Sequence, residues 1–118
     1  VLEPRNEGDV DVASQIEGRV VIEKGAVVRN SRIRGPVVIG AGSVIDHAYI
    51  GPYTSLGRNC KVEHSEMEHS VVLDGSSIVG IERLTDSLIG RDVQVTRSEQ
   101  KPRALRLMLG DDSKVELE

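Results

Sequence analysis

Large aliphatic residues recur along this chain with a period of 17 positions, and this recurrence strongly limits the possible folds. Three series share the spacing: Ile33, Ile50, Met67, Leu84; Ile22, Ile39, Leu56, Leu73; and Val28, Ile45, Val62, Val79. Helices repeat near 3.6 residues and strands alternate every two, so neither element alone produces this period. Spacings of six, six and five within each period predict three short strands per turn. In the last turn the aliphatic positions shift by one residue from this period, to Ile89 and Val95.

Turns of this kind are expected to stack on one another. Adjacent strands lie about 4.8 Å apart, so successive turns would form parallel sheets around an aliphatic interior. No single turn can bury its own inner face, which is why the unit must repeat. Glycines at the expected corners, in "IGAG", "IGPY" and "LGRN", suit tight changes of direction. The predicted fold is therefore an all-β parallel β-helix of about five turns, spanning residues 10–96.

The ends of the chain follow other patterns. Residues 1–9 are expected to be a linker from a missing N-terminal domain. The polar segment 97–103 is predicted to be a loop, because it contains Pro102. Residues 104–118 alternate apolar and polar positions around "GDDS", which predicts a capping β-hairpin, with a short helix over 103–109 as the alternative. Asp111 and Asp112 are interpreted as turn residues rather than as a metal pair.

Composition excludes several classes of protein. The 118 residues include no Trp or Phe, so Val, Ile and Leu must form the core, and the formal net charge of −4 argues against a nucleic-acid partner. No apolar run approaches the roughly 20 residues that span a membrane. Cys60 is the single cysteine, which fits a reducing, cytoplasmic compartment. Its position in a series of small residues predicts a buried structural thiol.

The histidines are the candidate functional residues. His47 and His64 lie one period apart, with Asn30 one period earlier, so they are expected to stack as an outward polar column at a corner. Two functional alternatives remain open. Either His47 or His64 could act as the general base of an acyltransferase. Alternatively His47, His64 and His69 could bind zinc, since "HSEMEH" has the spacing of two ligands in γ-class carbonic anhydrases, although Val62 and Glu63 depart from that family's pattern.

Two resemblances extend this interpretation. The repeat of an aliphatic residue, Gly and a small residue resembles the hexapeptide family, which implies left-handed winding. More specifically, "GPYTSLGRNCKV", "DSLIGRDVQV" and "ALRLMLGDDSKVELE" resemble the C-terminal region of long-form glucose-1-phosphate thymidylyltransferases, which are sugar nucleotidyltransferases.

This resemblance implies that a parent enzyme would join dTTP and glucose 1-phosphate with Mg²⁺ in an N-terminal catalytic domain, releasing dTDP-glucose and pyrophosphate. Nothing in this chain matches that domain's motifs, so no catalytic residue or cofactor site carries over. The implied role is that of an accessory domain. It would pack against its own catalytic domain and form a homo-oligomer, with a trimer preferred and a dimer as the alternative. The expected contact residues are Val21, Val38, Val44 and Val72.

Overall fold

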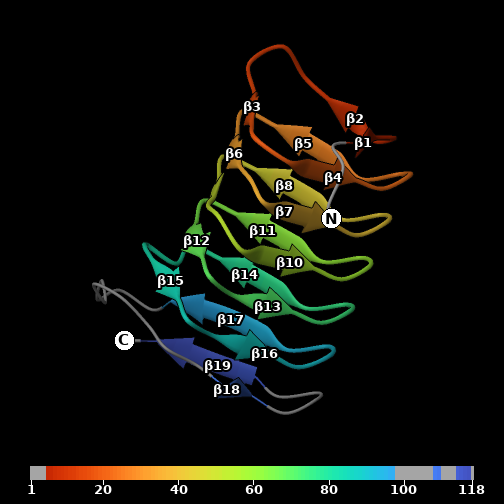
Figure 1. Ribbon diagram of the computed structural model, residues 1–118. Helices are drawn as coiled ribbons and strands as arrows, with labels where there is room; N and C mark the ends of the chain where they lie inside the picture. The colour runs from red at the N-terminus through yellow and green to blue at the C-terminus, as the bar shows by residue number, and fades with distance from the viewer. Residues whose placement is uncertain (1–4, 98–107, 110–113, 118) are drawn as a thin grey trace.

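The computed structural model describes residues 5–97, 108–109 and 114–117, and these form strands without a helix. Three parallel sheets wrap around one axis and enclose a narrow core (Figure 1). In five turns all three strands are described, and two faces continue further towards the C-terminus. The predicted parallel β-helix with its 17-residue period is confirmed. No helix long and apolar enough to cross a membrane occurs in the described part of the chain.

Each face of the column is one sheet, with one strand from each successive turn. Sheet A contains β1 (Arg5–Asn6), β4 (Val20–Ile22), β7 (Val37–Ile39), β10 (Thr54–Leu56), β13 (Val71–Val72), β16 (Leu88–Ile89) and β18 (Met108–Leu109). Sheet B contains β2 (Asp9–Val10), β5 (Val27–Arg29), β8 (Val44–Asp46), β11 (Lys61–Glu63), β14 (Ser77–Val79), β17 (Gln94–Arg97) and β19 (Lys114–Leu117). Sheet C contains β3 (Gln15–Glu17), β6 (Arg32–Arg34), β9 (Tyr49–Ile50), β12 (Glu66–Glu68) and β15 (Leu84–Thr85).

Most of the large interior side chains form aliphatic columns, one from each sheet. Their members are Ile22, Ile39, Leu56, Val72 and Ile89 from sheet A, Val28, Ile45, Val62, Ile78 and Val95 from sheet B, and Ile33, Ile50, Met67 and Leu84 from sheet C. Each of these residues is at most 1% exposed. Burying one such side chain contributes roughly 1.5–3 kcal/mol, so the filled columns supply the main stabilising energy.

The predicted columns of sheets A and B are wrong by one residue in their fifth turn. Val72 and Ile78 point inward, whereas Leu73, which was expected inside, is 39% exposed. The reason is a shortened corner, because Val72 follows Met67 by five positions while Ile39 follows Ile33 by six. The slip therefore occurs one turn earlier than predicted. Val72 also cannot serve as an outward contact residue.

The predicted N-terminal boundary of the β-helix also needs correction. Residues 1–9 were expected to be a linker, but β1 pairs in parallel with β4 through Arg5↔Val21, so the β-helix begins within this segment.

The prediction of a C-terminal capping hairpin is also wrong. β18 adds in parallel to β16, and β19 adds in parallel to β17, so these strands extend two faces of the β-helix rather than pairing with each other. An alternating pattern fits a parallel strand as well as a hairpin strand, so the sequence pattern could not distinguish them. The greater part of the predicted loop 97–103 lies outside the described residues. The left-handed winding stays a prediction.

Corners are formed by residues with positive φ at equivalent positions of successive turns. Between sheets A and B these are Gly25, Gly42, Asn59, Gly75 and Asp92. Between sheets B and C they are Asn30, His47, His64 and Gly80, with φ from 47° to 72°. Non-glycine residues rarely adopt this conformation, and Asn, Asp and His adopt it more readily than most. The corner geometry therefore explains why polar residues recur with the period of the core.

We expect Thr54→Val to stabilise the domain. Among the described residues, the buried Thr54 hydroxyl has no hydrogen-bond partner, and an unsatisfied buried group costs about 1–3 kcal/mol. Valine has nearly the same shape, so urea unfolding should show a gain of about 1 kcal/mol.

Ser70→Ala is the matched control, because Ser70 lies beside Thr54 in the next turn. The Ser70 hydroxyl donates to the Glu68 carbonyl and accepts from the Ser87 amide, so its removal should destabilise by about 1–3 kcal/mol. A loss of stability in Thr54→Val would contradict this description of the corner.

Candidate functional site

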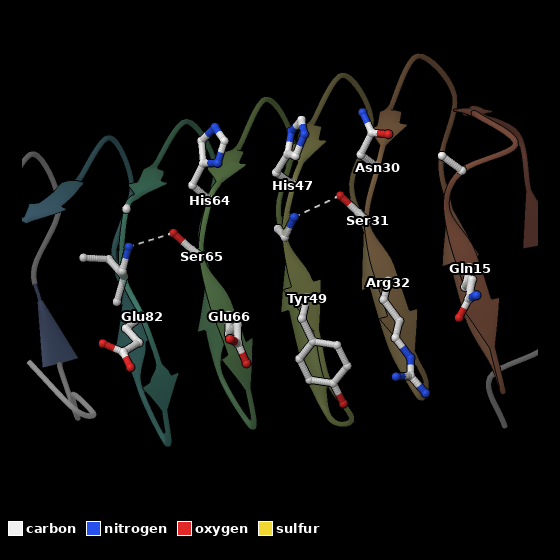
Figure 2. A pocket seen from close by; sticks show the side chains of 14 residues that line it. Gln15, Asn30, Ser31, Arg32, His47, Tyr49, His64, Ser65, Glu66 and Glu82 are labelled. Atoms are coloured by element: carbon white, nitrogen blue, oxygen red, sulfur yellow. Dashed lines mark hydrogen bonds between the residues drawn. The ribbon is translucent and has the colours of Figure 1, made fainter. Parts of the chain in front are cut away.

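An open groove of about 670 Å³ follows the corner between sheets B and C. Figure 2 shows two rows of side chains along it. One row follows the corner and consists of Asn30, His47 and His64. The other lies on the outer face of sheet C and includes Gln15, Arg32, Tyr49, Glu66 and Glu82. The first row was predicted from the sequence and the second was missed, although the same 17-residue spacing relates Gln15, Arg32, Tyr49 and Glu66.

The predicted stacking of the corner column is confirmed. The imidazole rings of His47 and His64 have centroids 5.0 Å apart and an interplanar angle of 17°. Both residues adopt φ of 49°, which directs their side chains outward from equivalent corners. The ring spacing matches the separation of adjacent parallel strands, about 4.8 Å. Backbone stacking therefore produces the imidazole stack without requiring a ligand.

One imidazole has a carboxylate partner. Nδ1 of His47 lies 2.7 Å from Oδ1 of Asp46, and the His47 side chain is 54% exposed. Such a contact orients the ring and leaves the second ring nitrogen available to another group. Asp46 belongs to the column next to the histidines, which also contains Arg29 and Glu63. In that column Arg29 donates to Asp9 over 2.7 Å, and this hydrogen bond raises the pKa of the guanidinium.

Serine hydroxyls beside the row of Asn30, His47 and His64 form hydrogen bonds with the backbone. Ser31 Oγ accepts from the Ala48 amide at 3.1 Å, and Ser65 Oγ accepts from the Ile81 amide at 2.9 Å (Figure 2). Each hydroxyl also donates to the carbonyl two residues earlier in its own chain segment. These hydroxyls are thus structural groups that join one turn to the next, and we assign them no chemical role.

His69 does not join the other two histidines. It lies at the corner between sheets C and A, where its ring packs against Tyr53 with centroids 5.3 Å apart. Within residues 5–97, no group of three or more His, Cys, Asp or Glu side chains is placed to hold a metal ion. One chain therefore does not assemble the alternative zinc set of His47, His64 and His69. Asp111 and Asp112 lie outside the described residues.

Cys60 has the surroundings expected of a structural thiol. It is 1% exposed, and its Sγ lies 3.2 Å from the Leu73 carbonyl oxygen. Burial raises the pKa of the thiol, which keeps it protonated and poorly nucleophilic at neutral pH.

The architecture places the chain among the parallel β-helices, whose stacked turns form a rigid column. No protein-family model matches the chain. It is 56% identical over 117 residues to a glucose-1-phosphate thymidylyltransferase of Streptomyces antibioticus, covering 99% of this chain and 33% of that protein. A glucose-1-phosphate thymidylyltransferase of Streptomyces griseus is 54% identical over 115 residues, covering 98% of this chain and 32% of that protein.

A third relative is more distant. The low-salt glycan biosynthesis nucleotidyltransferase of Haloferax volcanii is 37% identical over 67 residues, covering 56% of this chain and 19% of that protein. The chain thus spans about one third of the length of its two more similar relatives, and it matches their C-terminal part. It is similar to the C-terminal region of these two enzymes and folds as a parallel β-helix.

We expect Ala48→Ser to stabilise the domain, because Ala48 interrupts a ladder of serines. Ser14 Oγ accepts from the Ser31 amide and Ser31 Oγ accepts from the Ala48 amide, but position 48 has no hydroxyl to accept from the next turn at Ser65. A serine at position 48 would supply that acceptor, and thermal or urea unfolding should show a gain of about 1 kcal/mol.

Ser65→Ala is the matched control for this change. It removes the acceptor of the Ile81 amide and should destabilise by about 1–3 kcal/mol. Opposite effects of the two variants would support the ladder, whereas destabilisation by Ala48→Ser would contradict it.

Proposed function

We propose that this chain is the non-catalytic assembly domain of a sugar-1-phosphate nucleotidyltransferase. The observation that carries the proposal is the filled interior, since the aliphatic columns of all three sheets are at most 1% exposed and leave no space for a substrate among them. The similarity to the C-terminal third of two glucose-1-phosphate thymidylyltransferases supports the same role. A column of this kind can hold other parts of an enzyme at fixed positions.

The parent reaction would join dTTP to glucose 1-phosphate and release pyrophosphate. Mg²⁺ would be bound by the parent's N-terminal catalytic domain, where it would neutralise the phosphate charges. The described residues of this chain offer no cluster of three acidic or metal-binding side chains, so no step of the reaction is assigned to them. A cytoplasmic location fits the free and buried Cys60.

The outer face of sheet A is the candidate surface for joining subunits. From β4 to β16 its outward positions carry Val21, Val38, Ser55, Val71 and Leu88, and Arg5 occupies the equivalent position of β1. Val71 and Leu88 are each 40% exposed, whereas Val21, one of the expected contact residues, is buried at 7% exposure. Exposed apolar patches of this kind mark interaction sites. A homotrimer is the preferred assembly and a homodimer the alternative, with the covalent N-terminal domain as the further partner.

Acyl transfer remains the second candidate function, and the contact between Asp46 and His47 is the observation that favours it. A carboxylate that orients an imidazole is the usual arrangement for a general base. The groove is open, however, and nothing in the described part of one chain encloses a substrate there. The zinc alternative has less support because His69 lies at another corner.

The proposal is tested by the activity of the longer protein and of its parts. With dTTP, glucose 1-phosphate and Mg²⁺, the full-length protein should release pyrophosphate, while residues 1–118 alone should release none. His47→Ala and His64→Ala should each leave the full-length rate within about twofold, because neither residue touches the reacting groups in this proposal.

The same preparations distinguish the alternative. Consumption of acetyl-CoA with an amino-sugar acceptor, abolished by His47→Ala or His64→Ala, would overturn the assembly role in favour of acyl transfer. Light scattering on the full-length protein, with and without residues 1–118, should show a loss of subunits on truncation.

A further inference from the structure

The end of the β-helix at β1, β2 and β3 differs from the rest of the column because an inward aliphatic side chain, Ile16, is exposed there. Ile16 pairs in register with Ile33 and belongs to the same inward column as Ile50, Met67 and Leu84. The later members of the column are at most 1% exposed, whereas Ile16 is 38% exposed. Ile16 therefore has the orientation of a core residue, but no turn in the described part of the chain covers it.

The backbone at this end is also open. β1, β2 and β3 are each the terminal strand of their sheet in the described part of the chain, so one edge of each has no neighbouring strand. Open edges with apolar side chains readily pair with other polypeptide. The three strands lie together at one end of the column, as Figure 1 shows.

A rigid loop adds a second apolar side chain to this end. Val12 lies between β2 and β3 and is fully exposed, at 105%. Its loop is held in place by Asp11, whose carboxylate accepts from the Ser14 hydroxyl at 2.6 Å and from the Asn30 amide at 3.1 Å. The hydrogen bond from the Ser14 hydroxyl lowers the pKa of Asp11. Val12 is thus presented in a fixed position, and no packing within the described part of the chain accounts for it.

We propose that this end surface, formed by Val12, Ile16 and the open edges of β1–β3, docks the polypeptide that precedes this chain in the parent enzyme. Connectivity favours that occupant, because β1 belongs to this end and any preceding segment must enter there. The two more similar relatives are about three times as long as the matched region, which lies in their C-terminal part. The proposal rests on the proposed function and adds the location of the contact between domains.

The occupant presents an apolar face to the end surface. Charged groups at its rim are already engaged with partners in the chain, since Arg5 pairs with Glu7 at 2.8 Å and Arg29 with Asp9 at 2.7 Å. These pairs leave the apolar side chains and backbone edges as the main unsatisfied groups of the end surface. A docked segment that covers Ile16 would restore the burial that the other members of its column have.

Hydrogen–deuterium exchange on the full-length protein tests the proposal. Val12→Asp should open the contact and accelerate exchange in peptides covering residues 9–17 by about tenfold or more. Val12→Ser, which removes the apolar contact without adding a charge next to Asp11, should produce a smaller change in the same direction. The Val12 side chain is fully exposed, so neither substitution should unfold the β-helix itself.

Leu73→Asp is the matched control, because Leu73 is an exposed aliphatic residue far from this end, at the corner after β13. It should leave exchange at residues 9–17 unchanged. Unaltered exchange in both Val12 variants, or the same acceleration in Leu73→Asp, would overturn the docking proposal. Pyrophosphate release is measured separately, so absence of nucleotidyltransferase activity would refute the proposed function while the exchange comparison still decides the docking.

Discussion

Axial stacking of equivalent turns is the constraint on which the rest of this structure depends. A single turn offers only a few inward aliphatic side chains, and that small set cannot exclude water by itself. Parallel pairing places each turn on the next at a fixed register, which brings the inward side chains into continuous columns. Hydrogen bonding and apolar burial thus act along the same axis, so a break in the register would disturb both together.

The same stacking also determines what the surface can do. Equivalent corner positions of successive turns lie about 4.8 Å apart, so polar residues that recur with the period stack into ladders. The stack of His47 on His64 and the serine ladder beneath it both arise in this way. A site that needs three ligands around one point is difficult to build from such rows. Long rows suit extended contacts with other protein surfaces, which agrees with an assembly role.

The period, the parallel β-helix and the histidine column could be predicted from sequence because they depend only on spacing. The register of the fifth turn could not be predicted from spacing. Val72 and Leu73 are both aliphatic, as are Ile78 and Val79, so either member of each pair could point inward. Only the length of the corner before Val72 decides which one does. The last strands were misassigned since alternation does not reveal a strand's partner. The groove's second row was missed because its members share a spacing but differ in chemistry.

The most direct test of the stacked register is a comparison of Val72→Asp with Leu73→Asp by circular dichroism and thermal unfolding. Val72 is 1% exposed in the sheet A column, so a buried unpaired carboxylate there should prevent folding or lower the unfolding temperature severely. Leu73 is 39% exposed, and the adjacent substitution should leave a folded domain with nearly unchanged stability. Equal tolerance of both substitutions, or greater damage from Leu73→Asp, would contradict the register and the stacked interior that follows from it.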